Sequence, residues 1–149
     1  MQSSPQSLDR FLQAQDAVFE TVCEELAAGA KRSHWLWFVF PQLRALGRSS
    51  TAKYFGLADL DEAIAYWQHP VLGPRLKRCA DLLLTVTGKT VHDILGSPDD
   101  IKLRSCMTLF EAAAPEEPAF GAVLQHFYRG RRDDSTLRLI AAGGDSTTP

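Results

Sequence analysis

The segment Lys31–Gln42 constrains the fold of this chain more than any other part of its sequence. It reads KRSHWLWFVFPQ and contains two of the three tryptophans and two of the eight phenylalanines. No charged side chain occurs between His34 and Gln42, so water must be excluded from a large apolar surface here. We call Lys31–Gln42 the aromatic segment. It must lie in the interior, and the polar groups at its two ends must be satisfied by other parts of the chain or by a ligand.

The aromatic segment favours a short helix over a strand. Ser33 can cap such a helix, and Pro41 disfavours helical geometry at Phe40, so at most about two turns fit. Hydrophobic periodicity does not decide the matter, because all six central residues are apolar. The rest of the chain, however, offers no second clear strand. Trp35 and Trp37 would stand about 200° apart around a helix axis, so we expect this helix to be buried on all sides.

Length and composition indicate one ordinary globular domain. The chain has 149 residues, of which 45% are hydrophobic and 23% are charged, enough for a proper hydrophobic core. The net charge of −2 argues against a dedicated nucleic-acid-binding protein. No stretch approaches the roughly 18 apolar residues of a membrane span, and the first residues lack the features of a signal peptide. We therefore expect a cytoplasmic protein that binds neither nucleic acid nor a membrane.

Apolar periodicity, capping residues and glycine stops predict the other helices. We expect a first long helix from a Ser7 cap to a Gly29 stop. Asp59 and Thr90 should cap two shorter helices, and Ser97 should cap another that begins with a proline. Seven or eight short helices with linkers of about two to six residues predict a compact all-α fold, an orthogonal bundle. The helical domain should span residues 7–141, with flexible ends at 1–6 and 142–149.

The three cysteines predict neither a disulfide framework nor a zinc site. Cys23, Cys79 and Cys106 are far apart, and none belongs to a CxxC pair. Cys23 and Cys106 fall within apolar helical patterns, which is typical of small core residues. No metal ion and no cofactor is expected, because the histidines outside the aromatic segment are not spaced as metal ligands (His69, His92, His126).

Four motifs in order carry a family resemblance. They are Lys31-x-Ser33-His34-Trp35-x-Trp37-Phe38-x-Phe40-Pro41-Gln42, His69-Pro-x-Leu-Gly-x-Arg-Leu76, Asp100-x-Lys-Leu-x-Ser-x-Met-Thr-Leu-Phe110 and Asp133-Asp-Ser-Thr-Leu137. Over about residues 8–140 the chain resembles domain-of-unknown-function family 1810, although Cys106 stands where the family has a serine. The resemblance implies an all-helical bacterial protein and implies no activity. Members often carry the label calpastatin, which this apolar, well-capped sequence does not support, because the inhibitor of that name is a disordered chain.

A second and looser resemblance concerns the NADAR family, which processes ADP-ribose-type compounds. Its members carry a lysine followed within a turn by a methionine and then an apolar helix. The stretch from Lys102 to Met107 is similar in composition, but its spacing differs.

Two lysines and one histidine are the charged candidates for a site. Lys31 and Lys102 could each hold an anionic group such as a phosphate. The alternative for either lysine is a salt bridge to one of four aspartates (Asp99, Asp100, Asp133, Asp134). His34 is the candidate catalytic residue, because histidine can act as a general acid or base near neutral pH. The alternative is a half-buried histidine that donates a hydrogen bond to a backbone carbonyl.

The uncharged candidates also have alternative interpretations. Trp35 and Trp37 could form a stacking platform for a base or sugar, or they could belong to the core. Gln42 follows a proline in apolar surroundings, so its amide should either tie the loop or contact a ligand. Ser105 and Thr108 could hydrogen-bond back to the preceding helical turn, and a catalytic serine would need a nearby base.

Three functions from different classes follow. The first is a domain that binds an anionic, nucleotide-like small molecule in a pocket lined by Lys31, Ser33, His34, Trp35, Trp37, Gln42, Lys102 and Ser105. The second is a hydrolase of a nucleotide-sugar or ADP-ribose-type N-glycosidic bond that uses the same pocket. The third is a protein-interaction module in which these groups only support the fold. The sequence does not predict an oligomeric state.

Overall fold

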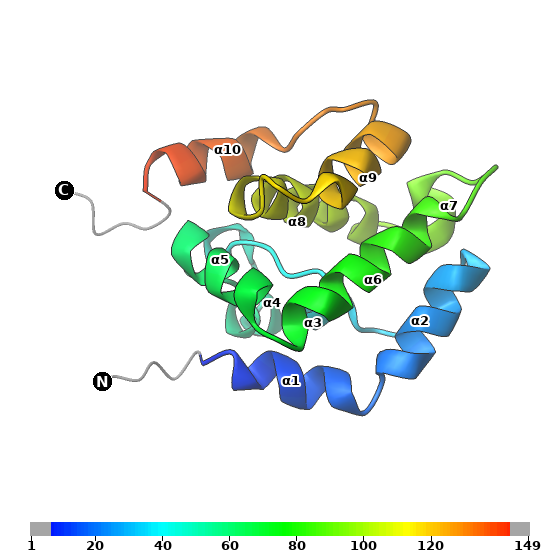
Figure 1. Cartoon of the computed structure of the whole chain (residues 1–149), viewed down its shortest axis with the longest axis horizontal. Helices are drawn as coiled ribbons and strands as arrows, with labels where there is room; N and C mark the ends of the chain where they lie inside the picture. Colours follow the sequence, from blue (N-terminus) through cyan, green and yellow to red (C-terminus); the bar gives the residue numbers. More distant parts are fainter. Residues whose placement is uncertain (1–6, 144–149) are drawn as a thin grey trace.

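The structure, a computed structural model, describes residues 7–143 and is all-α over that range, with ten α-helices and one 3₁₀ turn (Figure 1). The elements are α1 Asp9–Asp16, α2 Phe19–Ala28, α3 Leu36–Val39, η1 Arg44–Leu46, α4 Ser50–Tyr54, α5 Leu60–Gln68, α6 Leu72–Leu84, α7 Val91–Leu95, α8 Asp99–Ala113, α9 Pro118–Tyr128 and α10 Asp134–Ala141. The all-α prediction is confirmed, and the helix count slightly exceeds the seven or eight expected. None of these helices is long and apolar enough to span a bilayer.

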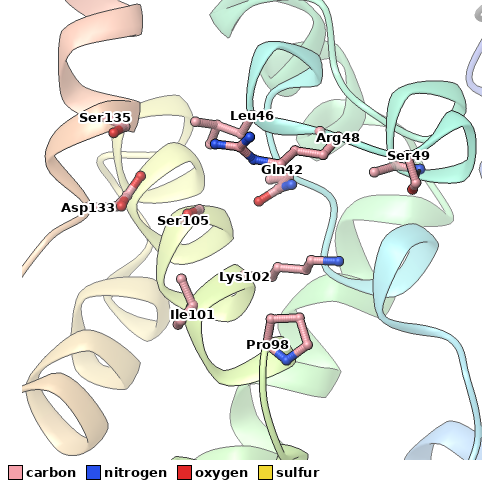
Figure 2. A pocket seen from close by; sticks show the side chains of 12 residues that line it. Gln42, Leu46, Arg48, Ser49, Pro98, Ile101, Lys102, Ser105, Asp133 and Ser135 are labelled. Atoms are coloured by element: carbon pink, nitrogen blue, oxygen red, sulfur yellow. Dashed lines mark hydrogen bonds between the residues drawn. The ribbon is translucent and has the colours of Figure 1, made fainter.

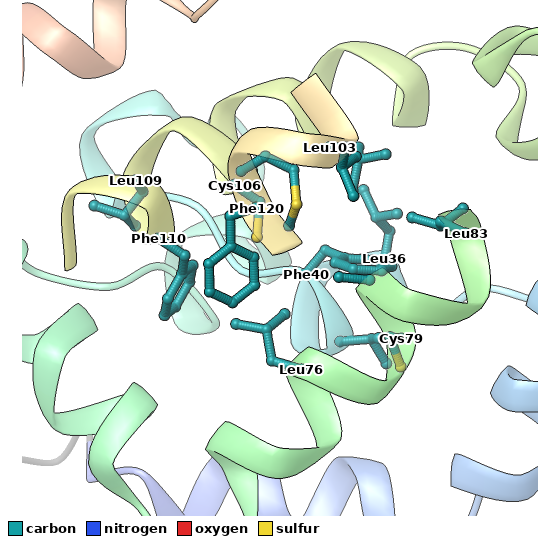
Figure 3. Close-up of a cluster of buried hydrophobic side chains, with 14 of the residues drawn as sticks. Leu36, Phe40, Leu76, Cys79, Leu83, Leu103, Cys106, Leu109, Phe110 and Phe120 are labelled. Atoms are coloured by element: carbon teal, nitrogen blue, oxygen red, sulfur yellow. The ribbon is translucent and has the colours of Figure 1, made fainter. Parts of the chain in front are cut away.

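Helices α5, α6, α8 and α9 pack around the hydrophobic core, and α8 contacts α5, α7, α9 and α10. The ring of Phe110 on α8 lies 5.4 Å from that of Tyr66 and 5.9 Å from that of Phe120. Figure 3 shows Leu36 and Phe40 of the aromatic segment among the side chains of α6 and α8. The core therefore holds the aromatic segment against the first half of α8.

The single helix expected between Ser7 and Gly29 is two helices, so that prediction is wrong. The chain bends at Val18, whose φ of −126° and ψ of 0° are not helical. Ser7 is not the cap either, because α1 follows Leu8 and has no side-chain cap. The stop is confirmed: Gly29 ends α2 at a φ of 68°, a left-handed conformation that glycine adopts readily.

Two polar residues of α1, the helix before the bend, are buried in the interior. Arg10 donates hydrogen bonds to the backbone carbonyls of Tyr54 and Gly56, at 2.7 and 2.9 Å. Gln15 donates to the backbone carbonyl of Phe38 at 2.6 Å. Both side chains are buried although they fall outside the apolar stripe of the sequence. Carbonyl groups from distant parts of the chain satisfy both side chains there.

The aromatic segment contains the expected short helix, α3, which has a single turn. Trp35 is buried as predicted, but Trp37 is only half-buried, so α3 is not enclosed on all sides. The reason is that the side of α3 that carries Trp37 borders a cavity instead of another helix. Ser33 is not the cap of α3, since the helix has no side-chain cap.

Of the three remaining expected caps, two are confirmed and one is wrong. Asp59 and Thr90 each accept a hydrogen bond from the backbone N–H three positions further on, at 2.8 and 3.0 Å. Ser97 does not cap α8: the helix follows Pro98, which has no capping side chain, and the N–H of Ile101 in the first turn donates to Oδ1 of Asp100 at 2.9 Å. Ser97 and Pro98, which directly precede α8, both line a cavity.

Candidate functional site

Two cavities meet at Lys102, on the first turn of α8. We name them the basic cavity, of about 430 Å³, and the hydroxyl cavity, of about 420 Å³. The charged and polar residues of the basic cavity are Lys31, Arg32, His34, Ser97, Asp99 and Lys102. Those of the hydroxyl cavity, apart from Lys102, are Gln42, Arg48, Ser49, Ser105, Asp133 and Ser135 (Figure 2). Lys102 and Pro98 line both cavities, so one molecule could occupy both.

Lys102 lies at the junction of the two cavities, and its ammonium group has no ion-pair partner among residues 7–143. Its side chain extends from α8 toward the aromatic segment, between Gln42 and Pro98 (Figure 2). The ammonium nitrogen lies 5.4 Å from the ring centre of Trp37. No carboxylate between residues 7 and 143 forms a salt bridge with Lys102. Of the two alternatives that the sequence left open for this lysine, the salt bridge is therefore absent from the described part of the chain.

Lys31, in contrast to Lys102, has a carboxylate partner within the described chain. Its ammonium nitrogen lies 2.9 Å from Asp99 Oδ2, and its side chain is only 7% exposed. Its backbone N–H donates to the carbonyl of Ile94 at 2.8 Å, which ties the aromatic segment to α7. The ammonium also lies 5.2 Å from the ring centre of Trp35. Lys31 thus borders the basic cavity while its charge is held by a carboxylate of α8.

Trp35 and Ser33 line neither cavity, because both are held by Glu25 of α2. The indole N–H of Trp35 donates to Glu25 Oε1 at 2.8 Å, and the hydroxyl of Ser33 donates to Glu25 Oε2 at 2.7 Å. The backbone N–H groups of Arg32 and Ser33 donate to the same carboxylate. Partial burial would raise the pKa of Glu25, but these hydrogen bonds outweigh it and hold the pKa at about 2. A stacking platform made of both tryptophans is not formed.

Trp37 and Gln42 lie between the two cavities. The indole nitrogen of Trp37 is buried and has no hydrogen-bond partner in the described part of the chain. Trp37, Gln42 and Lys102 together line a further small space of about 10 Å³. The backbone of Gln42 is fixed, since its carbonyl accepts from the N–H of Leu57 at 2.9 Å. No bond within residues 7–143 ties its side-chain amide, which leaves the ligand contact as the open alternative for Gln42.

His34 and Ser105 lie in different cavities. His34 is exposed at the edge of the basic cavity, and no backbone carbonyl in the described range accepts a bond from it. Ser105 is buried and lines the hydroxyl cavity. The expected bond to the preceding turn is made by Thr108, which donates to the carbonyl of Arg104 at 2.8 Å. A direct His34–Ser105 pair is not formed, so the two residues do not make a nucleophile and its base.

The basic cavity is positive within a chain that is negative overall. Lys31, Arg32 and Lys102 face a single carboxylate, Asp99, while the whole chain has a net charge of −2. Two carboxylates in the first turn of α8, Asp99 and Asp100, offset the positive end of its helix dipole, so the positive charge of the cavity comes from its cationic side chains. This arrangement favours an anionic guest.

Comparison with known families shows where the chain belongs. The family described as "Protein of unknown function (DUF1810)" matches residues 5–140. The chain belongs to the DUF1810 family. A solved structure similar to it is the conserved hypothetical protein Rv1873 from Mycobacterium tuberculosis, which is 49% identical in sequence. That similarity has a TM-score of 0.90 and covers 93% of this chain and 99% of the other. The curated proteins give no match.

Several residues that line the cavities of this DUF1810 protein were not predicted as site residues from the sequence. They come mostly from linkers and helix starts: Arg32, Arg48, Ser49, Ser97, Asp133 and Ser135. Asp133 is the cap of α10, accepting from the N–H of Thr136 at 3.0 Å, and its own N–H donates to Thr108. Capping residues and linker serines carry no periodic signal. Only the motif from Asp133 to Leu137 could have indicated that this stretch belongs near the site.

Proposed function

We propose that this DUF1810 protein binds an anionic, nucleotide-like small molecule across the two cavities that meet at Lys102. The observation that carries the proposal is the unpaired ammonium of Lys102, which lines both cavities without a carboxylate partner in the described residues. A half-buried cation is unfavourable unless a counter-charge reaches it. A phosphate placed in the basic cavity would supply that charge.

The division of polar groups between the cavities supports a ligand with two different ends. The basic cavity offers ammonium and guanidinium groups, which suit phosphate oxygens. The hydroxyl cavity offers three serine hydroxyls and the amide of Gln42, which suit the hydroxyls of a sugar or the edge of a base. Each cavity has the size of a typical small-molecule site, which is about 300–1,000 Å³.

Two polar side chains at the junction of the cavities, those of Trp37 and Gln42, also support a bound ligand. The buried indole N–H of Trp37 has no acceptor among the described residues, and buried donors are almost always satisfied by protein, water or ligand. The side-chain amide of Gln42, which makes no hydrogen bond within residues 7–143, lines the same small space. A ligand oxygen between the cavities would satisfy both groups at once.

The two other functions have less support. Hydrolysis of an N-glycosidic bond usually employs a free carboxylate, whereas Asp99 is paired with Lys31 and Asp133 caps α10. His34 remains the candidate general acid or base for that alternative. A protein-interaction module would need a contiguous apolar patch. The large apolar side chains that are exposed come instead from four separate segments (Tyr54, Val71, Ile101, Leu137).

A thermal-shift panel tests the proposal. It should contain inorganic phosphate, pyrophosphate, nucleoside mono- and diphosphates and nucleotide sugars, with unphosphorylated nucleosides as the uncharged control. A ligand that binds only the folded state adds about 2.7 kcal/mol of stability when its concentration is about 100 times Kd. We expect phosphorylated compounds to raise the Tm of the parent and not that of Lys102→Met. Lys53→Met is the matched control, because Lys53 is exposed on α4 and lines neither cavity.

Two results would contradict the proposal. One is a panel in which no phosphorylated compound stabilises the parent protein. The other is a Lys102→Met variant that keeps the full thermal shift of the parent, since the phosphate would then be held elsewhere.

A further inference from the structure

Helices α2 and α6 run in the same direction and pack side by side (Figure 1). Near their starts, the guanidinium carbon of Arg75 lies 5.0 Å from the ring centre of Phe19. Beyond their ends, the ammonium of Lys89 donates to the carbonyl of Gly29 at 3.0 Å. These contacts fix how far one helix is displaced along the other.

This alignment places Cys23 against Cys79. Cys23 follows Phe19 by four positions on α2, Cys79 follows Arg75 by four positions on α6, and residues four apart share a helix face. In this arrangement the Cys79 thiol and the Arg78 guanidinium are the neighbouring groups that act on the Cys23 thiol. Cys79 is fully buried and Cys23 is half-buried. Solvent therefore reaches the pair from the Cys23 side.

The surroundings favour a thiolate at Cys23. Hydrogen bonds from the Cys79 thiol and from Arg78 lower the pKa of Cys23 to about 6, although partial burial opposes the change. The same thiol contact, together with burial, raises the pKa of Cys79. Burial also raises the pKa of Cys106, which lies in the core. Among the three thiols, only Cys23 combines thiolate character with access to solvent.

We propose that Cys23 and Cys79 form a peroxide-reactive pair that closes reversibly to a disulfide between α2 and α6. The Cys23 thiolate attacks one oxygen of a hydroperoxide, the O–O bond breaks, and the other oxygen leaves as hydroxide or alkoxide. Cys23 becomes a sulfenic acid as the peroxide is reduced. The Cys79 thiol then attacks the Cys23 sulfur, the S–O bond breaks, and the Cys79 proton leaves with the hydroxyl as water. A dithiol reductant restores both thiols.

The pair stands apart from the anion site. Neither cysteine lines the basic cavity or the hydroxyl cavity. The reactive pair therefore does not depend on the proposed ligand, and each proposal can fail alone.

Peptide mapping of the full chain after treatment with hydrogen peroxide tests the pair. We expect a Cys23–Cys79 linked peptide that disappears on reduction with dithiothreitol. Cys106→Ala should form the same peptide, and Cys23→Ser should not. Cys79→Ser should instead accumulate the sulfenic acid of Cys23, which dimedone captures. Should Cys79→Ser not fold, the linked peptide of the parent protein decides the matter.

The rate of alkylation of Cys23 by iodoacetamide, followed against pH, tests the assignment of the attacking thiol. The midpoint should lie at about pH 6 in the parent protein. Arg78→Met should raise the midpoint by roughly one unit and slow alkylation at the parent midpoint about fivefold. Arg131→Met, which removes an exposed arginine elsewhere, should change neither.

The proposal is overturned if Cys23 of the parent protein stays reduced in peroxide, stops at the sulfenic or sulfinic acid, or pairs with Cys106. An alkylation midpoint near the ordinary thiol pKa of about 8.5 also overturns it.

Discussion

The two tryptophans of the aromatic segment each lie beside a lysine, Lys31 for Trp35 and Lys102 of α8 for Trp37, and the two pairs differ in how their polar groups are satisfied. In each pair a lysine ammonium lies over an indole ring, at 5.2 Å for Lys31 and Trp35 and at 5.4 Å for Lys102 and Trp37. In the first pair, both polar groups have a carboxylate partner, at 2.8 Å for the indole and 2.9 Å for the ammonium. In the second pair, neither group has a partner within residues 7–143.

This difference separates scaffold from site. Proteins satisfy the polar groups that they bury, so a satisfied pair needs nothing from outside. An unsatisfied pair that lines cavities on both sides has room for a guest that completes it. We therefore assign Trp35 and Lys31 to the scaffold and Trp37 and Lys102 to the ligand site.

The largest expected effect comes from truncating the tryptophans one at a time. Trp35→Ala removes a fully buried ring and should lower the free energy of unfolding by about 3–5 kcal/mol. Trp37→Ala removes a half-buried ring beside a cavity and should lower it by only about 1–2 kcal/mol. Urea denaturation followed by circular dichroism measures both. Equal losses would mean that the two rings are both core residues and that the distinction between the pairs fails.

The pH dependence of the free energy of unfolding tests the scaffold pair, because Glu25 accepts the hydrogen bond of Trp35. The folded-state pKa of Glu25, about 2, lies below the ordinary glutamate value of about 4.3. Its stabilisation is therefore fully present above that ordinary value and is lost as the pH falls toward about 2. Glu25→Gln should cost about 1–3 kcal/mol near neutral pH, because the glutamine lacks the charge that strengthens these hydrogen bonds.

The difference in stability between the parent protein and Glu25→Gln should shrink as the pH falls from about 5 to about 2. Denaturant melts at a series of pH values measure it. Glu24→Gln, at an exposed neighbour, is the matched control and should show no such trend. A difference that stays constant with pH would show that the carboxylate of Glu25 does not hold the segment.

Most of the fold follows from the sequence, because its signals are local. The caps at Asp59 and Thr90 and the stop at Gly29 depend on residues within one helical turn, and all three were predicted correctly. The break between α1 and α2 could not be predicted in this way. The first of the two helices buries Arg10 and Gln15, whose hydrogen-bond partners lie far along the chain, and no local pattern indicates those contacts.

The candidate site was only partly predictable for the same reason. Lys102 lies on the first turn of the same helix as Asp99, and helical spacing alone would pair them. Asp99 is instead paired with Lys31, from a distant segment, and Lys102 is left unpaired in the described chain. Which lysine holds the carboxylate is decided by tertiary packing. The sequence could name both lysines but could not say that they have different roles.

The smallest expected effect belongs to the lysines. Methionine keeps most of the packing of a lysine stem and removes its charge. Lys31→Met breaks a largely buried pair and leaves Asp99 without its partner, so it should lose about 1–2 kcal/mol. Lys102→Met breaks no ion pair with a described residue and should stay within about 0.5 kcal/mol of the parent protein, or become more stable.

The free energies of unfolding of Lys31→Met and Lys102→Met, measured side by side without ligand, test the separation of scaffold from site most directly. We expect Lys31→Met to be destabilised and Lys102→Met to be unchanged or stabilised. A Lys102→Met variant that loses as much stability as Lys31→Met would contradict the account. Lys102 would then stabilise the fold and would not be reserved for binding an anion.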